Sequence, residues 1–370
     1  MKFRANTRDF ADAVGAAAKI IKNNTTVPML LNVLIRAEDG NISVRATDLE
    51  TTIEKTLSAE IDGGGEIAVG GKLLAQWLTN VKNDVIEVSM EGNDLVLNAG
   101  KAAVAFPTQD GGQFPVLPTH EDSGPTIRID AKALRGAVIS TSFAASQEEA
   151  RGAVLMGTHI KAGGDGTVLV CTDGYRLAIQ KNVSVQEVES TCVIPTNALL
   201  EAARNIGDAD AVEATVIGAG RNQMRLIAGR TTIYVRLVDG NYPDYEKVLP
   251  KNSDRKVTVN TVELQDALKR SVIVAGDRAS MIILEVDAAG ITLNATSDTS
   301  GRAREQIEAE VQGEDLKINL NARYFIEILS HVNAPSTILE FAGPLAPVII
   351  RPAEDLSETE QKYILMPLRQ

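Results

Sequence analysis

The sequence predicts an α+β protein built from three tandem copies of one domain, each made of antiparallel strands and two short helices. The first observation is an aspartate that recurs every 125 residues, each time after an apolar, strand-like run: Asp48, Asp173 and Asp298. The second is a strand-to-helix junction that recurs at offsets of 125 and 126 residues: residues 69–74, 194–199 and 320–325. Several landmarks in one long period indicate a repeated domain.

Composition agrees with this prediction. A chain of 370 residues is long enough for two or three domains. Its 44% hydrophobic and 23% charged residues are ordinary for a soluble globular protein. No apolar run reaches the ~20 residues of a membrane span, and the N-terminus lacks the apolar stretch of a signal peptide. We therefore expect a cytoplasmic protein with no membrane partner.

The two cysteines, Cys171 and Cys192, both lie in apolar strand-like runs. Buried free thiols are the interpretation we favour over a disulfide or a metal-binding pair. We expect no cofactor and no metal.

Two clusters of Pro, Gly and charged residues, at 118–125 and 250–255, indicate short linkers. They divide the chain into predicted domains at residues 1–122, 123–253 and 254–370. Because the linkers are short, we expect the domains to be held in a fixed relation.

Within each copy the elements follow one order. A short strand opens the copy: residues 2–5, 126–129 and 256–259. A helix follows, with Asn6 or Thr7, Asp130 and Asn260 as the expected N-caps. Alternating strands then lead to a second helix: residues 72–82, 197–205 and 322–332. Each domain is therefore predicted to be two βαβββ halves, giving six helices in the chain.

The strands are expected to form antiparallel sheets with one wet face and one face covered by the helices. Copies with matching strand edges can join edge to edge into an arc. Three domains leave that arc open, so closure would require a second chain, most simply in a two-fold dimer.

Charge is unevenly distributed. The net charge of −12 and the aromatic content of 4% argue, as averages, against a large nucleic-acid surface. The six predicted helices nevertheless contain eleven Lys and Arg against six Asp and Glu, a net charge of +5. Either these are ordinary solvated helix faces, or they form a basic inner wall that attracts phosphates without sequence preference. The basic side chains of the second interpretation are Lys19, Lys22, Lys72, Lys82, Lys132, Arg135, Arg204, Lys269, Arg270 and Arg323.

The copies differ at positions that point to function. The repeated aspartates are predicted to be structural turn residues because all three copies carry them. Only the second copy continues with Gly174-Tyr175-Arg176-Leu177, and only its ending is expanded, over residues 242–250. The apolar segment 363–369 extends past the last predicted strand, and Pro367 cannot continue a strand ladder. We interpret residues 366–368 as a docking surface.

These residues closely resemble the bacterial sliding clamp family, the beta subunit of DNA polymerase III. The resemblance covers the whole chain and rests on the start at residues 1–3, on residues 172–177, 237–240, 242–245 and 248–250, and on the Met-Pro-Leu-Arg ending. It implies the DNA clamp fold, with antiparallel sheets outside and helices inside. It also implies a head-to-tail homodimer that forms a six-domain ring around duplex DNA, without sequence specificity. A clamp loader would open the ring, and the ring would tether the alpha subunit of the replicative polymerase, repair polymerases and ligase for processivity.

The resemblance also implies site residues. The partner-peptide pocket would consist of Leu155, Thr172, Gly174, Tyr175, Arg176, Leu177, Pro243, Lys247, Val248, Ile364, Met366, Pro367, Leu368 and Arg369. Dimer contacts would fall near Phe106, Ile273 and Val274. Three residues depart from the family pattern: Asn24 where a basic residue can occur, Tyr175 where some members have His, and Gln370 where some have Leu.

Two other function classes compete with the clamp. An enzyme is not supported, because His120, His159 and His331 have no recognisable Ser or Cys partner and no phosphate-binding loop or metal-ligand spacing is present. A docking scaffold that never encircles DNA is disfavoured by the basic balance of the helices, and DNA association that depends on salt would exclude it.

Overall fold

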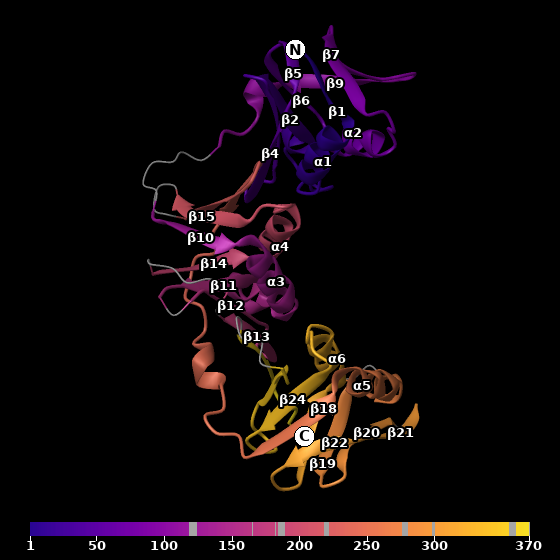
Figure 1. Ribbon diagram of the computed structural model, residues 1–370, viewed down its shortest axis with the longest axis vertical. Helices are drawn as coiled ribbons and strands as arrows, with labels where there is room; N and C mark the ends of the chain where they lie inside the picture. The colour runs from indigo at the N-terminus through magenta and orange to yellow at the C-terminus, as the bar shows by residue number, and fades with distance from the viewer. Residues whose placement is uncertain are drawn as a thin grey trace. The chain divides into compact units, whose positions relative to one another are not determined.

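The computed structural model (Figure 1) describes residues 1–117, 124–164, 166–181, 183, 189–217, 222–275, 280–297, 300–354 and 360–369. Asp298, His120, Gln370 and most of the first linker lie outside these ranges, so the predictions made for them are not addressed. The described residues contain six α-helices and 26 strands, in agreement with the predicted six helices. They form two compact units, described separately below: Met1–Lys132 with Glu201–Leu237, and Ala133–Leu200 with Val238–Gln370.

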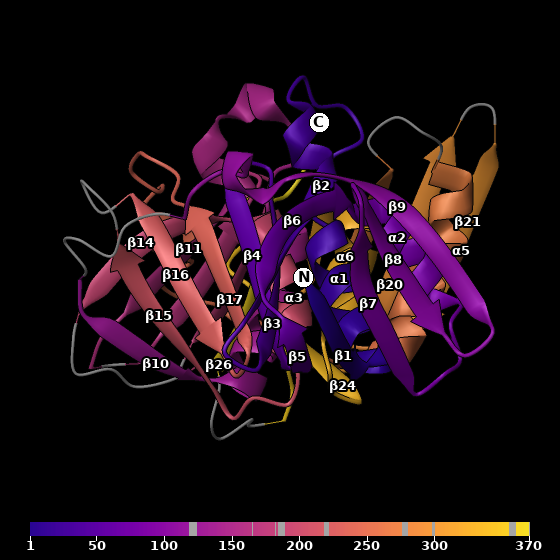
Figure 2. The ribbon, with the colours of Figure 1, turned by 90° about the horizontal axis from the view of Figure 1, so that it is seen from above.

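Unit 1 is built on one antiparallel sheet of 13 strands (Figure 2). Its strands are β1 (Lys2–Asn6), β2 (Asn32–Glu38), β3 (Asn41–Thr47), β4 (Thr51–Ser58), β5 (Glu60–Gly63), β6 (Gly65–Gly70), β7 (Val85–Glu91), β8 (Asp94–Ala99), β9 (Ala102–Asp110), β10 (Thr126–Asp130), β15 (Ala211–Ile217), β16 (Gln223–Ala228) and β17 (Thr231–Arg236). Its complete helices are α1 (Thr7–Ala18) and α2 (Gly71–Thr79). The order in the sheet is β10-β15-β16-β17-β4-β3-β2-β6-β9-β8-β7-β1-β5.

Unit 2 contains a sheet of nine strands and a sheet of four. Its strands are β11 (Gly157–Ala162), β12 (Val168–Thr172), β13 (Arg176–Lys181), β14 (Ser190–Pro195), β18 (Arg255–Asn260), β19 (Met281–Asp287), β20 (Gly290–Ser297), β21 (Gly301–Ile307), β22 (Ala309–Gln312), β23 (Leu316–Asn321), β24 (Ser336–Phe341), β25 (Val348–Pro352) and β26 (Glu360–Leu365). Its complete helices are α5 (Thr261–Ala275) and α6 (Ala322–Ser330), while α3 (Ala131–Thr141) and α4 (Thr196–Asn205) belong partly to each unit. The sheet orders are β14-β11-β12-β13-β26-β25-β24-β18-β22 and β21-β20-β19-β23.

Consecutive copies are joined through their strand edges, as predicted. In unit 1, β17 of the second copy pairs with β4 of the first, with Ile233 opposite Ile53. In unit 2, β26 of the third copy pairs with β13 of the second, with Ile364 opposite Leu177. Each junction is therefore a continuous hydrogen-bonded sheet rather than a flexible tether.

The helices cover the apolar sheet faces through residues spaced by one turn. Phe10 and Val14 of α1, and Leu264 and Leu268 of α5, are fully buried. Of the two predicted caps of α1, the structure selects Asn6, whose Oδ1 accepts hydrogen bonds from the amides of residues 8 and 9 at 2.9 and 3.1 Å. α1 is thus fixed by one apolar stripe and by its capped first turn.

The helix ends correct the predicted charge pattern. α1 ends at Ala18 and α2 at Thr79, so Lys19, Lys22 and Lys82 lie after the helices rather than on them. The helices as folded carry eight Lys and Arg against six Asp and Glu, a net charge of +2 rather than +5. These two helices are shorter than predicted because their last turns tighten into i→i−3 hydrogen bonds. After α1 the chain turns and buries residues 20 and 21.

Candidate functional site

The repeated aspartates form the same turn in the first two copies. Asp48 lies between β3 and β4, and its Oδ1 accepts hydrogen bonds from the amides two and three residues later, at 3.1 and 2.8 Å. Asp173 lies between β12 and β13 and makes the same two bonds, both at 2.9 Å. The next residue has a left-handed backbone in both turns, with φ of 75° at Leu49 and 86° at Gly174. The structural role predicted for Asp48 and Asp173 is confirmed.

The second copy alone builds an arginine network on this turn. Arg176, only 8% exposed, donates from Nε to Asp173 Oδ2 at 3.2 Å and from Nη2 to the carbonyl oxygen of Phe143 at 2.9 Å. Its Nη1 donates to Glu327 Oε2 on α6 at 2.5 Å. The guanidinium also lies 4.5 Å from the ring centroid of Tyr324 and 5.2 Å from that of Phe143. Arg176 therefore ties the turn to α6 of the third copy.

Tyr175 stands beside this network and is 45% exposed. Arg151 donates from Nη2 to Tyr175 Oη at 3.0 Å and from Nη1 to the Asp173 carbonyl oxygen at 2.9 Å. The Arg151 guanidinium lies 4.4 Å from the Tyr175 ring centroid, and that ring stacks on Tyr324 at 6.2 Å. The hydrogen bond that Arg151 donates to Tyr175, and then the one that it donates to Glu148, raise the pKa of Arg151, so this side chain is a fixed cation. An exposed aromatic ring is thereby held in one position at the edge of the turn.

The C-terminal tail is attached to the same turn. β26 ends at Leu365, as predicted, and Leu365 lies opposite Arg176 in β13. The next amide, of Met366, donates to the Tyr175 carbonyl oxygen at 2.9 Å, and the Leu368 amide donates to the Asn319 carbonyl oxygen at 2.8 Å. Residues 366–368 are partly exposed. The predicted tail and the predicted turn are therefore neighbours.

An apolar cluster underlies the turn and the tail. Leu177 and Ile364, both predicted pocket residues, are buried together with Tyr245. Tyr245 opens the 3₁₀ turn Tyr245–Val248, whose last residue, Val248, is 39% exposed. This turn reaches the cluster through Tyr245, a residue that the sequence analysis did not assign to the site.

The remaining predicted pocket residues lie around this cluster with different exposure. Pro243 and Lys247 are exposed, and Lys247 forms an ion pair with Asp244 at 2.9 Å. Leu155 is partly buried, Thr172 is buried, and Arg369 is exposed. Hydrogen bonds and strand pairing thus join residues 172–177 to residues 364–368, whereas Lys247 pairs, among the described residues, with Asp244 and not with the tail.

The sequence analysis missed four residues of the network: Phe143, Arg151, Tyr324 and Glu327. Tyr324 and Glu327 are three residues apart on α6 and therefore share one face, which is the only sequence signal they offer. Nothing in the sequence places that face against a turn some 150 residues earlier.

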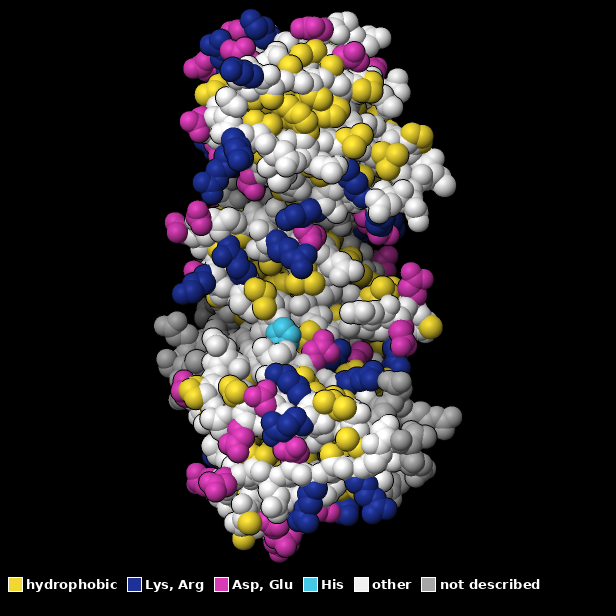
Figure 3. Space-filling view, turned by 90° about the vertical axis from the view of Figure 1, so that its right-hand side faces the viewer, with side chains coloured by type: hydrophobic (Ala, Val, Ile, Leu, Met, Phe, Trp, Pro, Cys, Tyr) yellow, Lys and Arg dark blue, Asp and Glu magenta, His cyan; other side chains and the backbone are white. Residues whose placement is uncertain are grey.

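Among the basic residues predicted to face DNA, Lys22, Arg204, Lys269 and Arg270 are paired with acids. Lys22 Nζ lies 2.9 Å from Asp48 Oδ2, and this hydrogen bond raises the pKa of Lys22. Arg270 pairs with Glu305 at 2.7 Å, and Lys269 with residue 266 at 3.2 Å. Figure 3 shows Lys and Arg side chains mixed with Asp and Glu side chains on the face that it draws. Pairs this exposed are worth only about 0–1 kcal/mol, so phosphates can replace the acids.

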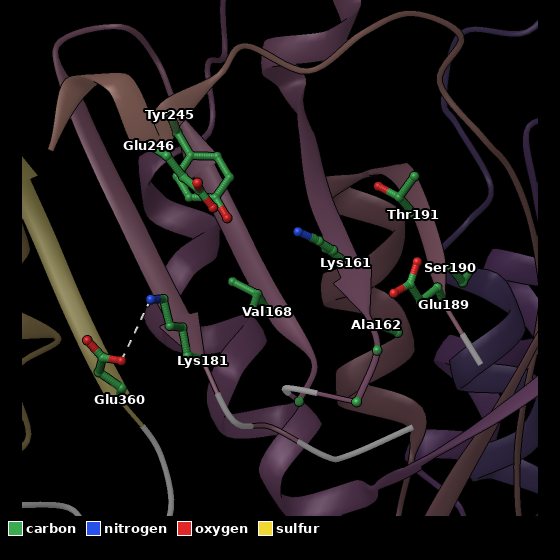
Figure 4. Close-up of a pocket in the computed structure, with 13 residues that line it drawn as sticks. Lys161, Ala162, Val168, Lys181, Glu189, Ser190, Thr191, Tyr245, Glu246 and Glu360 are labelled. Carbon is green, nitrogen blue, oxygen red and sulfur yellow. Dashed lines mark ion pairs between the residues drawn. The ribbon is translucent and has the colours of Figure 1, made fainter. Parts of the chain in front are cut away.

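A separate cavity of about 660 Å³ lies on unit 2 (Figure 4). It is lined by Lys161, Val168, Thr191, Tyr245 and residues near them. None of the predicted pocket residues lines it, so the cavity is not the candidate site.

Two of the three histidines of the enzyme alternative, His159 and His331, lie in the described part of the chain, and both are structural. The His159 ring stacks on Tyr242 at 4.8 Å, and the His331 ring stacks on Phe143 at 4.3 Å. Burial lowers the pKa of both imidazoles. Both cysteines are free thiols, and burial raises the pKa of Cys171 to about 11, which suppresses its thiolate. Within the described ranges, no group of three or more His, Cys, Asp or Glu side chains could hold a metal ion, and no helix is long and apolar enough to cross a membrane.

Family-level sequence models now decide the assignment. Three models of the DNA polymerase III beta subunit match the chain. The model of its N-terminal domain matches residues 1–118, that of its central domain residues 128–244, and that of its C-terminal domain residues 246–369. The chain belongs to the DNA polymerase III beta subunit family. Its curated relatives include the beta sliding clamps of Streptomyces coelicolor and Caulobacter vibrioides, each 28% identical over 378 residues. Both alignments cover all of this chain, together with 99% of the Streptomyces protein and 100% of the Caulobacter protein.

Solved beta subunits give the same result. The subunit from Thermotoga maritima is 27% identical with a TM-score of 0.92, covering 100% of this chain and 99% of that one. A Pseudomonas aeruginosa sliding clamp bound to griselimycin is 25% identical with a TM-score of 0.93, covering both chains completely. The predicted family, the clamp fold and the DNA sliding clamp function are therefore confirmed. The family is one of processivity factors, so the prediction that the chain is not an enzyme is confirmed by its membership.

Proposed function

We propose that two copies of this beta subunit close into a head-to-tail ring around duplex DNA, and that the ring tethers the replicative polymerase. The observation that carries the proposal is the edge-to-edge joining of the copies, through β17 with β4 and β26 with β13. Such joining leaves strand edges that only another chain can complete. The proposed domains are residues 1–122, 123–253 and 254–370, and the proposed location is the cytoplasm.

DNA would be held by topology and by weak phosphate contacts rather than by base recognition. The exposed, locally paired lysines and arginines support this, because they can exchange a carboxylate for a phosphate at little cost. The proposed DNA-facing set keeps the ten predicted side chains, including Lys19, Lys22 and Lys82, which follow the helices. A mobile clamp needs such screened, sequence-independent contacts.

Partner proteins would dock at the turn of the second copy. The apolar cluster under Leu177 and Ile364, the exposed Tyr175 ring and the tail at Met366–Leu368 supply an apolar surface with fixed polar anchors, which suits an extended peptide. We propose the polymerase alpha subunit, the clamp loader, repair polymerases and ligase as the occupants.

Retention on circular and linear DNA tests the ring. The protein is loaded on nicked circles with the cognate loader and ATP, and the circles are then linearised at moderate salt. Retention on circles and loss from linear DNA is expected for a topological link. Equal loss from both forms, after loading has been verified, would replace the ring with a docking scaffold that does not encircle DNA.

Removal of residues 366–370 tests the docking site. The truncated protein should lose the binding of a polymerase-derived peptide and keep its oligomeric state. The matched control is Lys101→Ala, which removes an exposed charge from the turn between β8 and β9. Peptide binding unchanged by the truncation would contradict the assignment.

A further inference from the structure

We infer that the cavity on unit 2 (Figure 4) binds a small zwitterionic molecule with an apolar ring, and that its occupant strengthens docking through Tyr245. The first part of this inference is independent of the proposed function. The second part rests on the proposed docking at the turn of the second copy. The cavity volume of about 660 Å³ lies within the usual range of small-molecule sites.

The floor of the cavity is a row of side chains across five neighbouring strands. Lys161 of β11 lies opposite Thr191 of β14 on one side and opposite Val168 of β12 on the other. The pairing of β12 with β13 continues this row to Lys181, which lies opposite Glu360 of β26. Because side chains directly opposite each other point to the same face, the row forms one continuous surface.

Val168 separates two lysines on this floor. Neighbouring strands are about 4.8 Å apart, so the backbones that carry Lys161 and Lys181 are about 10 Å apart. Figure 4 shows Val168 between the two side chains. Val168 packs against the apolar cluster that contains Tyr245, and both residues line the cavity. The floor therefore offers an apolar patch with a cation on either side.

The two cations differ in their partners. Lys181 Nζ lies 3.8 Å from Glu360 Oε2, and Glu360 also pairs with Lys362. Lys161 is exposed and forms no hydrogen bond or ion pair with the residues that the structure describes. Burial and then the charge of Lys161 lower the pKa of His159, two residues earlier on the same strand. Lys161 is therefore the cation of the floor that an anionic group can approach.

Two carboxylates lie at the rim of the cavity. Glu246 belongs to the 3₁₀ turn after residue 244 and Glu189 precedes β14, and Figure 4 shows them on opposite sides of Lys161. Both are exposed, and neither forms an ion pair within the described part of the chain. A ligand with only negative charge would be repelled by these carboxylates, whereas a zwitterion satisfies both signs. We therefore expect its carboxylate at Lys161 and its ammonium group at the rim.

The rest of the wall leaves space for the body of such a molecule. Gly163 and Gly164, in the hairpin between β11 and β12, line part of the cavity. A Cβ atom added at Gly164 would meet nothing within 4 Å, so the space next to it is open. Ser190 and Thr191 add hydroxyl groups that can donate to a carboxylate. A dipeptide with an aromatic side chain has the charges, the polar groups and the ring that this lining fits.

Tyr245 belongs both to the cavity and to the apolar cluster under the docking site. It is 9% exposed and is buried together with Leu177 and Ile364. Tyr242 fixes the same segment of chain, because its Oη donates to the Val170 carbonyl oxygen at 3.3 Å. A ligand that packs on Tyr245 holds the 3₁₀ turn that this residue opens, and the last residue of that turn is a predicted pocket residue. Fixing the turn before a peptide arrives reduces the ordering that binding requires, so peptide affinity rises.

Isothermal titration calorimetry at low salt, with alanyl-phenylalanine as the probe, tests the site. The N-acetyl form of this dipeptide keeps only the carboxylate and the amide form keeps only the ammonium group. Each should bind about two- to fivefold more weakly, as expected for the loss of one exposed ion pair. Lys161→Met should weaken the binding of alanyl-phenylalanine in the same way, and Glu189→Gln with Glu246→Gln should remove its advantage over the N-acetyl form. The matched control is Lys317→Met, on the other sheet of unit 2, which should bind normally.

Removal of residues 366–370 should leave the binding of alanyl-phenylalanine unchanged, which separates the cavity from the docking site. Circular dichroism melting checks that each variant is folded. No binding of the dipeptide, equal binding of the three probes, or binding that is lost with the tail but kept in Lys161→Met would overturn the site.

The link to docking has its own readout. Saturating alanyl-phenylalanine should raise the affinity of a polymerase-derived peptide by about fivefold, the lower end of couplings between two sites. An unchanged peptide affinity, with the dipeptide bound, would overturn the link through Tyr245. A polymerase-derived peptide that binds neither with nor without the dipeptide would instead overturn the proposed docking, while the titration still decides the cavity.

Discussion

Arg176 should be the most costly side chain to remove from the docking turn. Arg176→Ala deletes the contacts to Asp173, to Glu327 and to the Phe143 carbonyl oxygen, and it empties the space between two aromatic rings. Unit 2 would then lose the ionic link between the turn of the second copy and α6 of the third, and the stack of Tyr175 on Tyr324 would remain.

The expected loss of stability can be estimated from the burial of each partner. Breaking a buried ion pair costs about 3–5 kcal/mol, because one charge stays buried without its partner. The Asp173 side chain is 11% exposed but keeps its two amide bonds through Oδ1, and the Glu327 side chain is 45% exposed and can be hydrated. These facts place the ionic loss at the lower limit, about 3 kcal/mol. Loss of the cation–π contacts adds about 0.5–1 kcal/mol.

The first copy supplies the matched control. Lys22 pairs with Asp48, the equivalent aspartate, but its side chain is 59% exposed. Lys22→Ala should therefore cost less than about 1 kcal/mol. Each substitution removes a cation that pairs with the turn aspartate of its copy, in a buried setting for Arg176 and in an exposed setting for Lys22.

Hydrogen exchange measured by mass spectrometry is the appropriate assay, because two units need not unfold in one step. Peptides covering β12, β13 and α6 should lose protection in Arg176→Ala, whereas unit 1 should not change. The single tryptophan, Trp77 on α2, reports the unfolding of unit 1 independently. Equal, small effects of Arg176→Ala and Lys22→Ala would refute the estimate.

Two further predictions concern single positions. His159→Phe keeps the stack on Tyr242 and removes a buried base whose pKa is lowered by burial. As the pH falls, the imidazole of the unfolded chain binds its proton before the folded one does, so the fold has its full stability above pH 6.5 and loses stability below it. The variant should show a smaller decline in the free energy of unfolding between pH 7 and 5. Urea unfolding that gives the same pH dependence for both proteins would contradict this. Gly174→Ala should lower the free energy of unfolding by about 1–2 kcal/mol, because an alanine is strained at the φ of 86° found there. Leu49→Gly, at a φ of 75°, should not destabilise unit 1. A Gly174→Ala variant that is more stable than the wild type would contradict the role of φ.

The sequence was sufficient for the repeat, the six helices and the joined edges, because each follows from local pattern and period. The helix ends were predicted too far along the chain, and Lys19, Lys22 and Lys82 were misplaced as a result. Composition cannot show where a last turn tightens, since burial of residues 20 and 21 decides it. The network around Arg176 was incomplete for a related reason: Tyr324 and Glu327 reach it only through tertiary packing.

The comparison of the two turns explains why we propose only one of them as a docking site. The strand leaving each junction is attached in the same way, by Arg236 N to the Glu50 carbonyl oxygen at 2.8 Å and by Met366 N to the Tyr175 carbonyl oxygen at 2.9 Å. This backbone hydrogen bond is therefore common to both junctions, and it cannot explain why a peptide would bind at one junction and not at the other.

The side chains of the two turns differ. The position of Arg176 is Thr51 in the first copy, which cannot reach a carboxylate on another helix, and the position of Tyr175 is Glu50, which pairs loosely with Lys22 at 3.8 Å. Arg176 fixes the turn against α6, and this rigidity lets Tyr175 present its ring with little entropy left to lose on binding. Docking strength should accordingly depend on Arg176 even though its guanidinium is buried and out of reach of a peptide. If peptide affinity survived Arg176→Ala while the exchange protection of the turn was lost, preorganisation would be excluded as the source of affinity.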